Sequence, residues 1–249
     1  MKQGITIFLI VVGIPFATKS QYKTEHTNMV WEGYYNTFSI NKKWSLLSDA
    51  QRRTREWTQH WSQLLVRSGL SYKVNEHVSV TGGFAFFKNA QYADKDLLLK
   101  NEYRPWQELF YQVKLNKFNL TQRLRTEQRF QQQVINNELT KKYSFIFRLR
   151  YRCEALFPLK SNKMTFLVAN EIMVNPGYIS NTLFFDQNRT FAGLNIRMKE
   201  NTALQFQYVK IFQWHSTSRI LEKQDVLRVN LFQQLSYRKQ ISKQKKRTV

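Results

Sequence analysis

The sequence has few of the residues that staple, bend or interrupt a chain: among 249 residues there are one cysteine, four prolines and eight glycines. A lone Cys153 has no partner within the chain, which excludes a small scaffold held together by disulfides. The scarcity of glycine and proline, without any long low-complexity stretch, also excludes an extended flexible linker. We therefore predict one continuous folded domain over residues 21–238.

Long apolar runs are also missing, since nothing after residue 20 approaches the roughly 20 apolar residues that a membrane-spanning helix needs. The one apolar run, ITIFLIVVGI at residues 5–14, follows the basic start Met1-Lys2-Gln3 and precedes the small residues Thr18 and Ser20. This order is typical of a secretory signal peptide, which we predict over residues 1–20; the alternative is an uncleaved N-terminal anchor. An exported chain of this kind is either soluble or crosses a membrane as a β-barrel.

Acidic residues are scarce as well: 17 Asp and Glu face 39 Lys and Arg, a net charge of +22. Such an excess suits nucleic acid, anionic lipid headgroups or a lumen that attracts anions. Because the chain is predicted to be exported, we expect no nucleic-acid partner. The basic end of the chain, residues 239–249, is predicted to be a solvated tail.

Motifs that would signal an enzyme are absent: there is no zinc-ligand spacing, no glycine-rich phosphate loop and no Gly-x-Ser-x-Gly elbow. We predict no metal, no cofactor and no catalytic residue. The enzyme alternative is a barrel that modifies lipids with a serine, a histidine and an acid. Its candidate residues are His26, His60, His77, His215, Ser62, Ser79 and Ser216.

Strict alternation of apolar and charged residues is the dominant pattern. In LTQRLRTEQRF, residues 120–130, charges recur at every second position, while Leu120, Leu124 and Phe130 belong to the opposite face. The stretch 143–154 repeats the pattern, with aromatic and apolar residues opposite three arginines and Glu154. A period of two residues predicts strands rather than helices.

The same period predicts strands at 29–40, 43–54, 61–74, 77–88, 102–115, 118–131, 142–155, 163–174, 187–199, 202–214 and 224–238. Short turns are predicted at Asn41-Lys42, Asn75-Glu76, Asn116-Lys117 and Glu200-Asn201, and longer loops at 55–60, 89–101, 132–141, 175–186 and 215–223. Strands this long match the roughly 9 to 11 residues that cross a bilayer at a tilt, and short turns alternating with longer loops are the outer-membrane barrel arrangement.

We therefore predict an all-β fold, an antiparallel transmembrane β-barrel of 10–12 strands. Twelve is preferred, because bacterial single-chain barrels have even numbers and a short first strand at 22–28 would complete the count. Aromatic residues near the strand ends are interpreted as the rings that such barrels place at headgroup depth: Trp31, Tyr35, Trp44, Trp61, Tyr72, Trp106, Tyr208, Trp214 and Tyr237.

If the apolar face meets lipid, the charged face must line the lumen, because a charge at the bilayer midplane of a barrel costs about 2–4 kcal/mol. The predicted lumen charge network, which we also treat as candidate solute contacts, consists of Arg123, Arg125, Glu127, Arg129, Arg148, Arg150, Arg152, Glu154, Glu108 and Glu171. It could brace a narrow barrel through ion pairs, or form a basic constriction that selects anions. We expect bracing to be its main role, since small barrels commonly fill their interiors.

Five blocks resemble a known family: NEYRPWQ (101–107), LTQRLRTEQRF (120–130), RLRYR (148–152), ANE (169–171) and QNRTFAGL (187–194). They are similar to successive blocks of the bacterial domain-of-unknown-function family DUF2490, over residues 31–237. The resemblance implies an exported protein of Gram-negative bacteria with an outer-membrane barrel. It implies no catalytic residue, and the basic tail departs from a barrel that ends at its last strand.

The expected function is therefore that of an integral, non-enzymatic outer-membrane barrel, either structural or a narrow porin-like channel for small or anionic solutes. Its expected partners are outer-membrane lipid, lipopolysaccharide and small anionic solutes. Besides the lipid-modifying enzyme, the remaining alternative is a soluble exported β protein whose interleaved arginines and aromatics bind polyanions.

Overall fold

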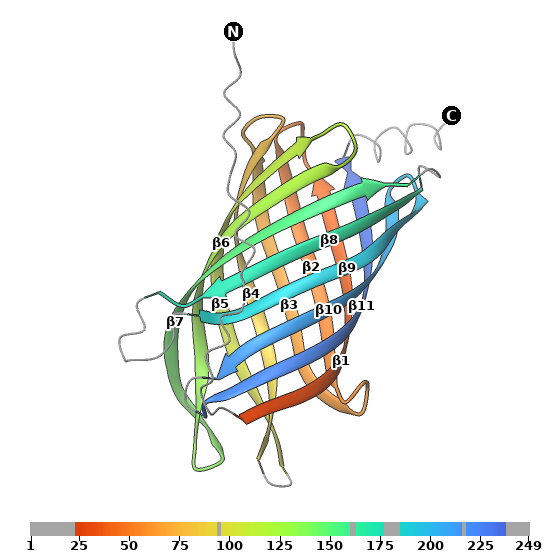
Figure 1. Cartoon of the computed structure of the whole chain (residues 1–249). Helices are drawn as coiled ribbons and strands as arrows, with labels where there is room; N and C mark the ends of the chain where they lie inside the picture. Colours follow the sequence, from red (N-terminus) through yellow and green to blue (C-terminus); the bar gives the residue numbers. More distant parts are fainter. Residues whose placement is uncertain (1–22, 94–95, 160–162, 177–184, 216–217, 238–249) are drawn as a thin grey trace, which may run out of the picture.

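A computed structural model describes residues 23–93, 96–159, 163–176, 185–215 and 218–237, which form one closed β-barrel (Figure 1). The predicted signal peptide and basic tail lie outside the described residues. Within those residues, no helix is long and apolar enough to cross a membrane. The strands are β1 Lys23–Ser39, β2 Trp44–Arg55, β3 His60–Lys73, β4 Val78–Ala93, β5 Asp96–Lys114, β6 Asn119–Ile135, β7 Glu138–Pro158, β8 Met164–Val174, β9 Phe185–Lys199, β10 Thr202–His215 and β11 Ile220–Ser236.

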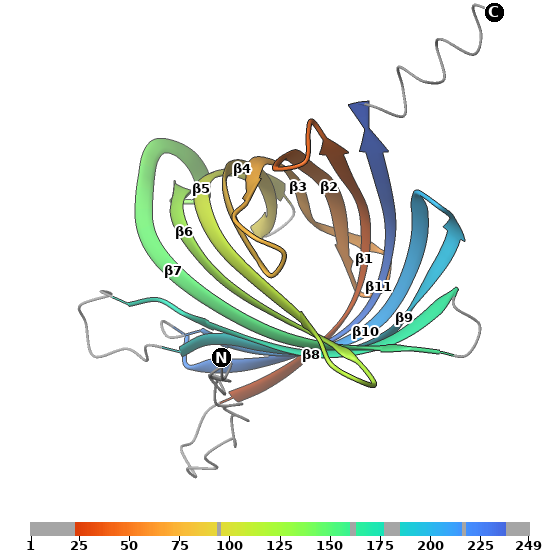
Figure 2. The same cartoon turned by 90° about the horizontal axis from the view of Figure 1, so that it is seen from above.

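The described residues form a closed ring of eleven strands, so the preferred count of twelve is wrong. Figure 2 shows the barrel from above. The stretch 22–28 is not a separate strand, because β1 begins at Lys23 and runs without a break to Ser39. Consecutive strands are antiparallel, and an odd number of them makes the first and last run in the same direction. The barrel therefore closes with a parallel pair, β1 and β11, in register from Lys23 opposite Ile220 to Ser39 opposite Ser236.

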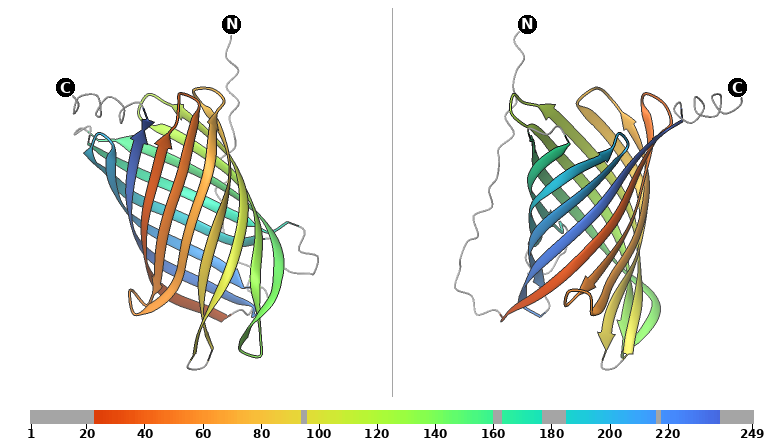
Figure 3. Two further views of the ribbon diagram at one scale, coloured as in Figure 1. Left: turned by 180° about the vertical axis from the view of Figure 1, so that it is seen from behind. Right: turned by 90° about the vertical axis from the view of Figure 1, so that its right-hand side faces the viewer.

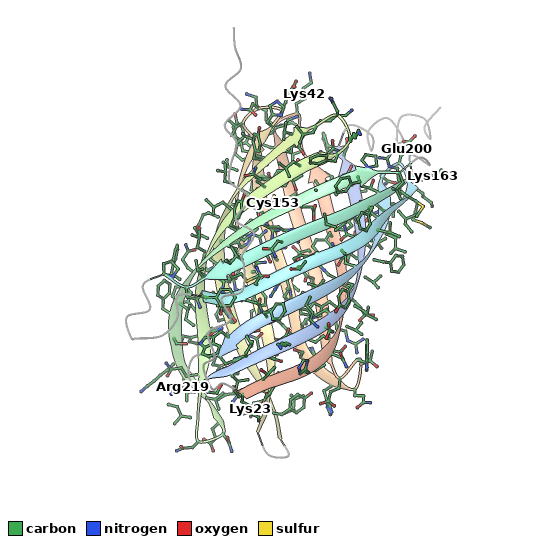
Figure 4. All side chains as sticks on the ribbon, in the orientation of Figure 1. Lys23, Lys42, Cys153, Lys163, Glu200 and Arg219 are labelled. Atoms are coloured by element: carbon green, nitrogen blue, oxygen red, sulfur yellow. The ribbon has the colours of Figure 1, made fainter. Side chains whose placement is uncertain are left out.

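The two ends of the barrel differ in their connections. Lys42, Lys163 and Glu200 mark the turn end, and Lys23 and Arg219 mark the loop end (Figure 4). At the turn end, the Asn41 side chain accepts hydrogen bonds from the backbone N–H groups of Lys43 and Trp44, each at 2.8 Å. Asn75 repeats this arrangement in the β3–β4 hairpin, the next one at the turn end. Asparagine stabilises tight turns in this way, which explains why these turns could be predicted.

Strands reach further toward the loop end than their sequence pattern predicts. Residues 89–101 and 132–141 are predicted loops, yet β4 continues to Ala93, β5 begins at Asp96, and β6 and β7 meet at a turn on Asn136 and Asn137. Both turn residues have positive φ, 51° and 60°, which asparagine tolerates. The hairpins β4–β5 and β6–β7 extend at the loop end (Figure 3). Where both faces of a hairpin meet solvent, no alternation is needed, so the pattern fades before the strand ends.

The wall is apolar outside and charged inside, the reverse of an ordinary soluble β-barrel. Outward side chains such as Val66, Phe84 and Leu124 are exposed, whereas Glu102 and Glu127 are buried in the lumen. Two buried apolar clusters share the lumen with these charges, one around Trp31 and Phe191 and one made of Leu65, Ala85, Phe87 and Trp106. Trp31 and Trp106 therefore lie inside the barrel, and the prediction that they belong to the aromatic rings at headgroup depth is wrong. Alternation along each strand thus separates the two environments.

Gly83 should be needed for this packing, whereas its neighbour Gly82 should not. A Cβ on Gly83 would overlap the Ser68 carbonyl oxygen and lie 2.6 Å from the Trp106 ring, but a Cβ on Gly82 meets nothing within 4 Å. Gly83→Ala is expected to lower the free energy of unfolding by about 1–3 kcal/mol through overpacking, and Gly82→Ala to leave it nearly unchanged. Denaturant midpoints of the two refolded variants test this; equal midpoints would contradict it.

Candidate functional site

The lumen contains a cavity of about 250 Å³ whose wall is dominated by guanidinium groups. Eleven arginines line it: Arg53, Arg67, Arg104, Arg123, Arg125, Arg129, Arg148, Arg150, Arg152, Arg189 and Arg228. Several guanidiniums lie over aromatic rings, including Arg104 over Phe87 at 3.9 Å and Arg53 over Trp31 at 4.0 Å. Such stacking fixes the plane of a guanidinium and leaves its N–H edge free to bind acceptors.

One wall of the lumen, β5 to β8, is a continuous network of ion pairs. Glu127 accepts hydrogen bonds from Arg104 at 2.9 Å and Arg150 at 2.7 Å. Glu171 accepts two from Arg150, each at 3.0 Å, and also pairs with Arg123 and Arg189. Both carboxylates are buried. Each shared carboxylate connects arginines from neighbouring strands, so these ion pairs hold the strands of this wall in one register.

Strand register explains why the carboxylates are shared. Arg125 lies directly opposite Arg150 across β6 and β7, and Arg123 lies opposite Arg152. Like charges facing each other repel, so each needs carboxylates on the neighbouring strands. Glu108 on β5 lies opposite Arg125, and Glu171 on β8 lies opposite Arg152.

All ten residues of the predicted lumen charge network carry ion pairs in the structure. Arg123 and Arg125 contact Glu108; Arg123 and Arg150 contact Glu171; Arg150 contacts Glu127; Arg129 contacts Glu102; Arg148 contacts Asp186; and Arg152 contacts Glu154. Each arginine of the set therefore has a carboxylate within 4 Å. Ion pairs of this kind are what the bracing interpretation predicts.

The opposite wall, formed by β1, β2, β10 and β11, holds two arginines of a different kind. Arg53 donates to the Gln51 side chain at 3.1 Å, and Arg228 donates to Asn230 at 3.1 Å, to Gln207 at 3.2 Å and to the Tyr35 hydroxyl. All of these partners are neutral. Among the described residues, neither arginine has a carboxylate within ion-pair distance, so their charges are not compensated locally.

The lumen residues that the sequence did not single out include Arg53, Arg67, Arg104, Arg189 and Arg228, with the carboxylates Asp49, Glu102 and Asp186. Arg104 was within reach, since it alternates with Glu102 and Trp106 inside the block NEYRPWQ. Arg53 could not be found in this way, because Arg52 stands next to it and alternation does not say which of the two faces the lumen. Arg52 pairs with Glu32 in an exposed ion pair, whereas Arg53 lines the cavity.

Three histidines of the enzyme alternative, His60, His77 and His215, have partners other than serine. Among the described residues no hydrogen bond joins a histidine to a serine: His60 pairs with Glu56 at 3.3 Å, and the His77 ring bonds the Gln112 carbonyl at the turn end. His215, the last residue of β10, forms a hydrogen bond with the Glu222 carboxylate at 2.9 Å. Ser216 lies outside the described residues.

A family model describing a protein of unknown function, DUF2490, matches residues 28–221, most of the chain and ten of its strands in full or in large part. The chain belongs to the DUF2490 family. No curated protein shows a significant match to this DUF2490 chain. Among solved structures it is similar to the NanC porin, with a TM-score of 0.51 and 14% sequence identity over 83% of this chain and 99% of that one. At that identity the likeness shows the fold, a closed β-barrel, and nothing finer.

Proposed function

We propose that this DUF2490 protein is a non-enzymatic, integral β-barrel of the Gram-negative outer membrane that acts as a narrow porin-like pore for small anionic solutes. The observation that carries the proposal is the charge balance of the lumen. Eleven arginines line the cavity, and they pair with seven carboxylates: Asp49, Glu102, Glu108, Glu127, Glu154, Glu171 and Asp186. Among the described residues, four positive charges are left over, enough to repel cations from a narrow passage.

The outer surface supports the membrane part of the proposal. Along β3, the outward residues Val66 and Leu70 are exposed apolar side chains. Toward the turn end this row finishes at Tyr72, whose ring packs against Trp44 with centroids 4.8 Å apart. Toward the loop end it meets Arg52 and Lys88, which lie opposite Leu64 on the neighbouring strands. An apolar belt bounded by aromatic and charged residues is what a bilayer requires of a barrel.

Strand length and closure support it further. The strands contain 11 to 21 residues, well beyond the five or six that are usual in soluble sheets. A closed ring leaves no unpaired backbone groups at a sheet edge, and the interior of a bilayer does not tolerate such groups. The similar solved structure is that of a porin, which agrees with this proposal.

The test is a reversal potential in planar bilayers. Refolded protein between unequal KCl solutions is expected to conduct with chloride more permeant than potassium, because the lumen carries excess arginine. Arg53→Gln with Arg228→Gln is expected to reduce this preference, since both charges lack carboxylates. Arg52→Gln, a neighbouring arginine on the outer face, is the matched control and should leave the preference unchanged.

Two results would count against the proposal. Protein that stays soluble in the periplasmic fraction without detergent would remove the membrane part. Refolded barrels that conduct no ions, or that prefer potassium, would contradict the proposal of a pore for anions. The charges of β5 to β8 would then serve only to brace the wall.

A further inference from the structure

A single cross-strand row brings together the uncompensated arginines. Trp31 on β1 lies directly opposite Arg53 on β2 and directly opposite Arg228 on β11. The row continues to Gln207 on β10, which lies opposite Arg228. Trp31, Arg53 and Arg228 all line the cavity. Because neighbouring strands are about 4.8 Å apart, the backbones of Arg53 and Arg228 are about 10 Å apart with Trp31 between them.

Hydrogen-bond donors of this row lack acceptors. The side-chain atoms Trp31 Nε1, Arg53 Nε and Gln207 Nε2 are buried and have no hydrogen-bond partner among the residues that the structure describes. Trp31 is only 3% exposed and Gln207 only 4%. Buried donors are normally satisfied, and leaving one without a partner costs about 1–3 kcal/mol. Three such donors on one row indicate that an acceptor of hydrogen bonds belongs there.

The charges of the row point to the sign of that acceptor. Neither arginine has a carboxylate partner among the described residues, and the two lie on the strands on either side of Trp31, directly opposite it. Two like charges held together are relieved by an anion that bridges them. The Arg53 guanidinium lies 4.0 Å from the centroid of the Trp31 ring, so its plane is fixed before any ligand arrives.

We propose that Arg53, Trp31, Arg228 and Gln207 form a binding site for one divalent tetrahedral oxyanion, sulfate, hydrogen phosphate or the phosphate end of a small solute. Two uncompensated positive charges match two negative ones. Four acceptor oxygens can engage the guanidinium edges together with the indole and amide N–H groups. A monovalent halide offers neither the charge nor the spread of acceptors. The proposal names the solute class of the pore proposed above, and it rests on that function only for its biological use.

The experiment is calorimetric titration of sodium sulfate into refolded protein in detergent micelles, at constant ionic strength set with sodium chloride. One saturable site is expected. Arg53→Gln and Arg228→Gln are each expected to weaken binding about tenfold or more, because each removes charged hydrogen bonds. Arg52→Gln, which changes the same residue type on the outer face, should bind like the unchanged protein. Trp31→Phe, which removes one donor and keeps the aromatic packing, should bind less tightly without losing the site.

Inorganic phosphate is the second probe, because its charge changes with pH whereas the charge of sulfate does not. The affinity of inorganic phosphate should rise as pH increases through its second pKa, where the hydrogen phosphate dianion forms, whereas the affinity of sulfate should not change with pH. Variants that fail to give the heat-modifiable band of a folded barrel are replaced by Arg53→Lys, which keeps the charge, loses the planar fork and is expected to bind sulfate more weakly than arginine does. No sulfate binding above chloride, or equal binding by Arg53→Gln and Arg52→Gln, would overturn the site.

The two proposals can fail separately. If sulfate binding depends on Arg53 and Arg228 but the barrel conducts no ions, the oxyanion site is supported and the pore is contradicted. Anion-selective conductance without saturable sulfate binding would keep the pore and remove the site.

Discussion

Glu171→Gln is expected to lower the free energy of unfolding by about 3–5 kcal/mol, the range measured when one partner of a buried ion pair is removed. Glu171 is 1% exposed and pairs with Arg123, Arg150 and Arg189. Glutamine fills the same volume but supplies no negative charge, so three arginines would share the remaining carboxylates of β5 to β7. The loss should appear as a lower denaturant midpoint in lipid vesicles.

Glu25→Gln is the control for that change. Glu25 pairs with Lys23 at 2.8 Å, but both side chains are well exposed. Exposed ion pairs contribute about 0–1 kcal/mol, so its midpoint should stay close to that of the unchanged protein. If the two variants unfolded at the same denaturant concentration, the β5 to β8 network would not be what holds this wall together.

Val66→Arg is expected to impair folding into bilayers, with a cost of about 2–4 kcal/mol for a cation facing lipid near the midplane. Val66 is 51% exposed in the middle of β3, with Ala50 and Phe86 opposite it on the two neighbouring strands. No polar partner lies directly across from it. The fraction of protein that gives the heat-modifiable folded band in vesicles measures the effect.

Val74→Arg makes the same chemical change at the same exposure, 50%, but beyond the last residue of β3, at the turn end. There an arginine reaches water or headgroups, and the cost should fall to about 0–1 kcal/mol. Equal folding yields for the two arginine variants would contradict the proposal that the outer face of β3 meets lipid. The comparison therefore tests the membrane belt without reference to conductance.

Alternation predicted the strands well wherever one face is apolar and the other charged, as along β6 and β7. It could not predict how many strands close the ring, because the pairing of β1 with β11 joins residues about two hundred positions apart, such as Trp31 and Arg228. The even-number expectation failed on this point. The predicted strand ends were wrong for a different reason. Near the loop end both faces of the β4–β5 and β6–β7 hairpins meet solvent, so their residues need not alternate between apolar and polar.

The lumen residues likewise divide into those that the sequence could predict and those that it could not. The arginines and glutamates of β5 to β8 could be found because several stand at every second position within one strand. The row of Arg53, Trp31 and Arg228 has one member on each of three strands, and only register brings them together. Nothing near Arg53 in the sequence distinguishes it from Arg52, although one lines the cavity and the other faces outward.

The parallel β1–β11 pair has a consequence for the sidedness of the chain. Because both strands run from the loop end to the turn end, Lys23 and Ser236 lie at opposite mouths of the barrel. In a barrel with an even number of strands, the first and last strands are antiparallel. The beginning of the first strand and the end of the last strand then lie at the same mouth of the barrel. Here a bilayer around the wall would place Lys23, the first residue of β1, on one side of the membrane and Ser236, the last residue of β11, on the other.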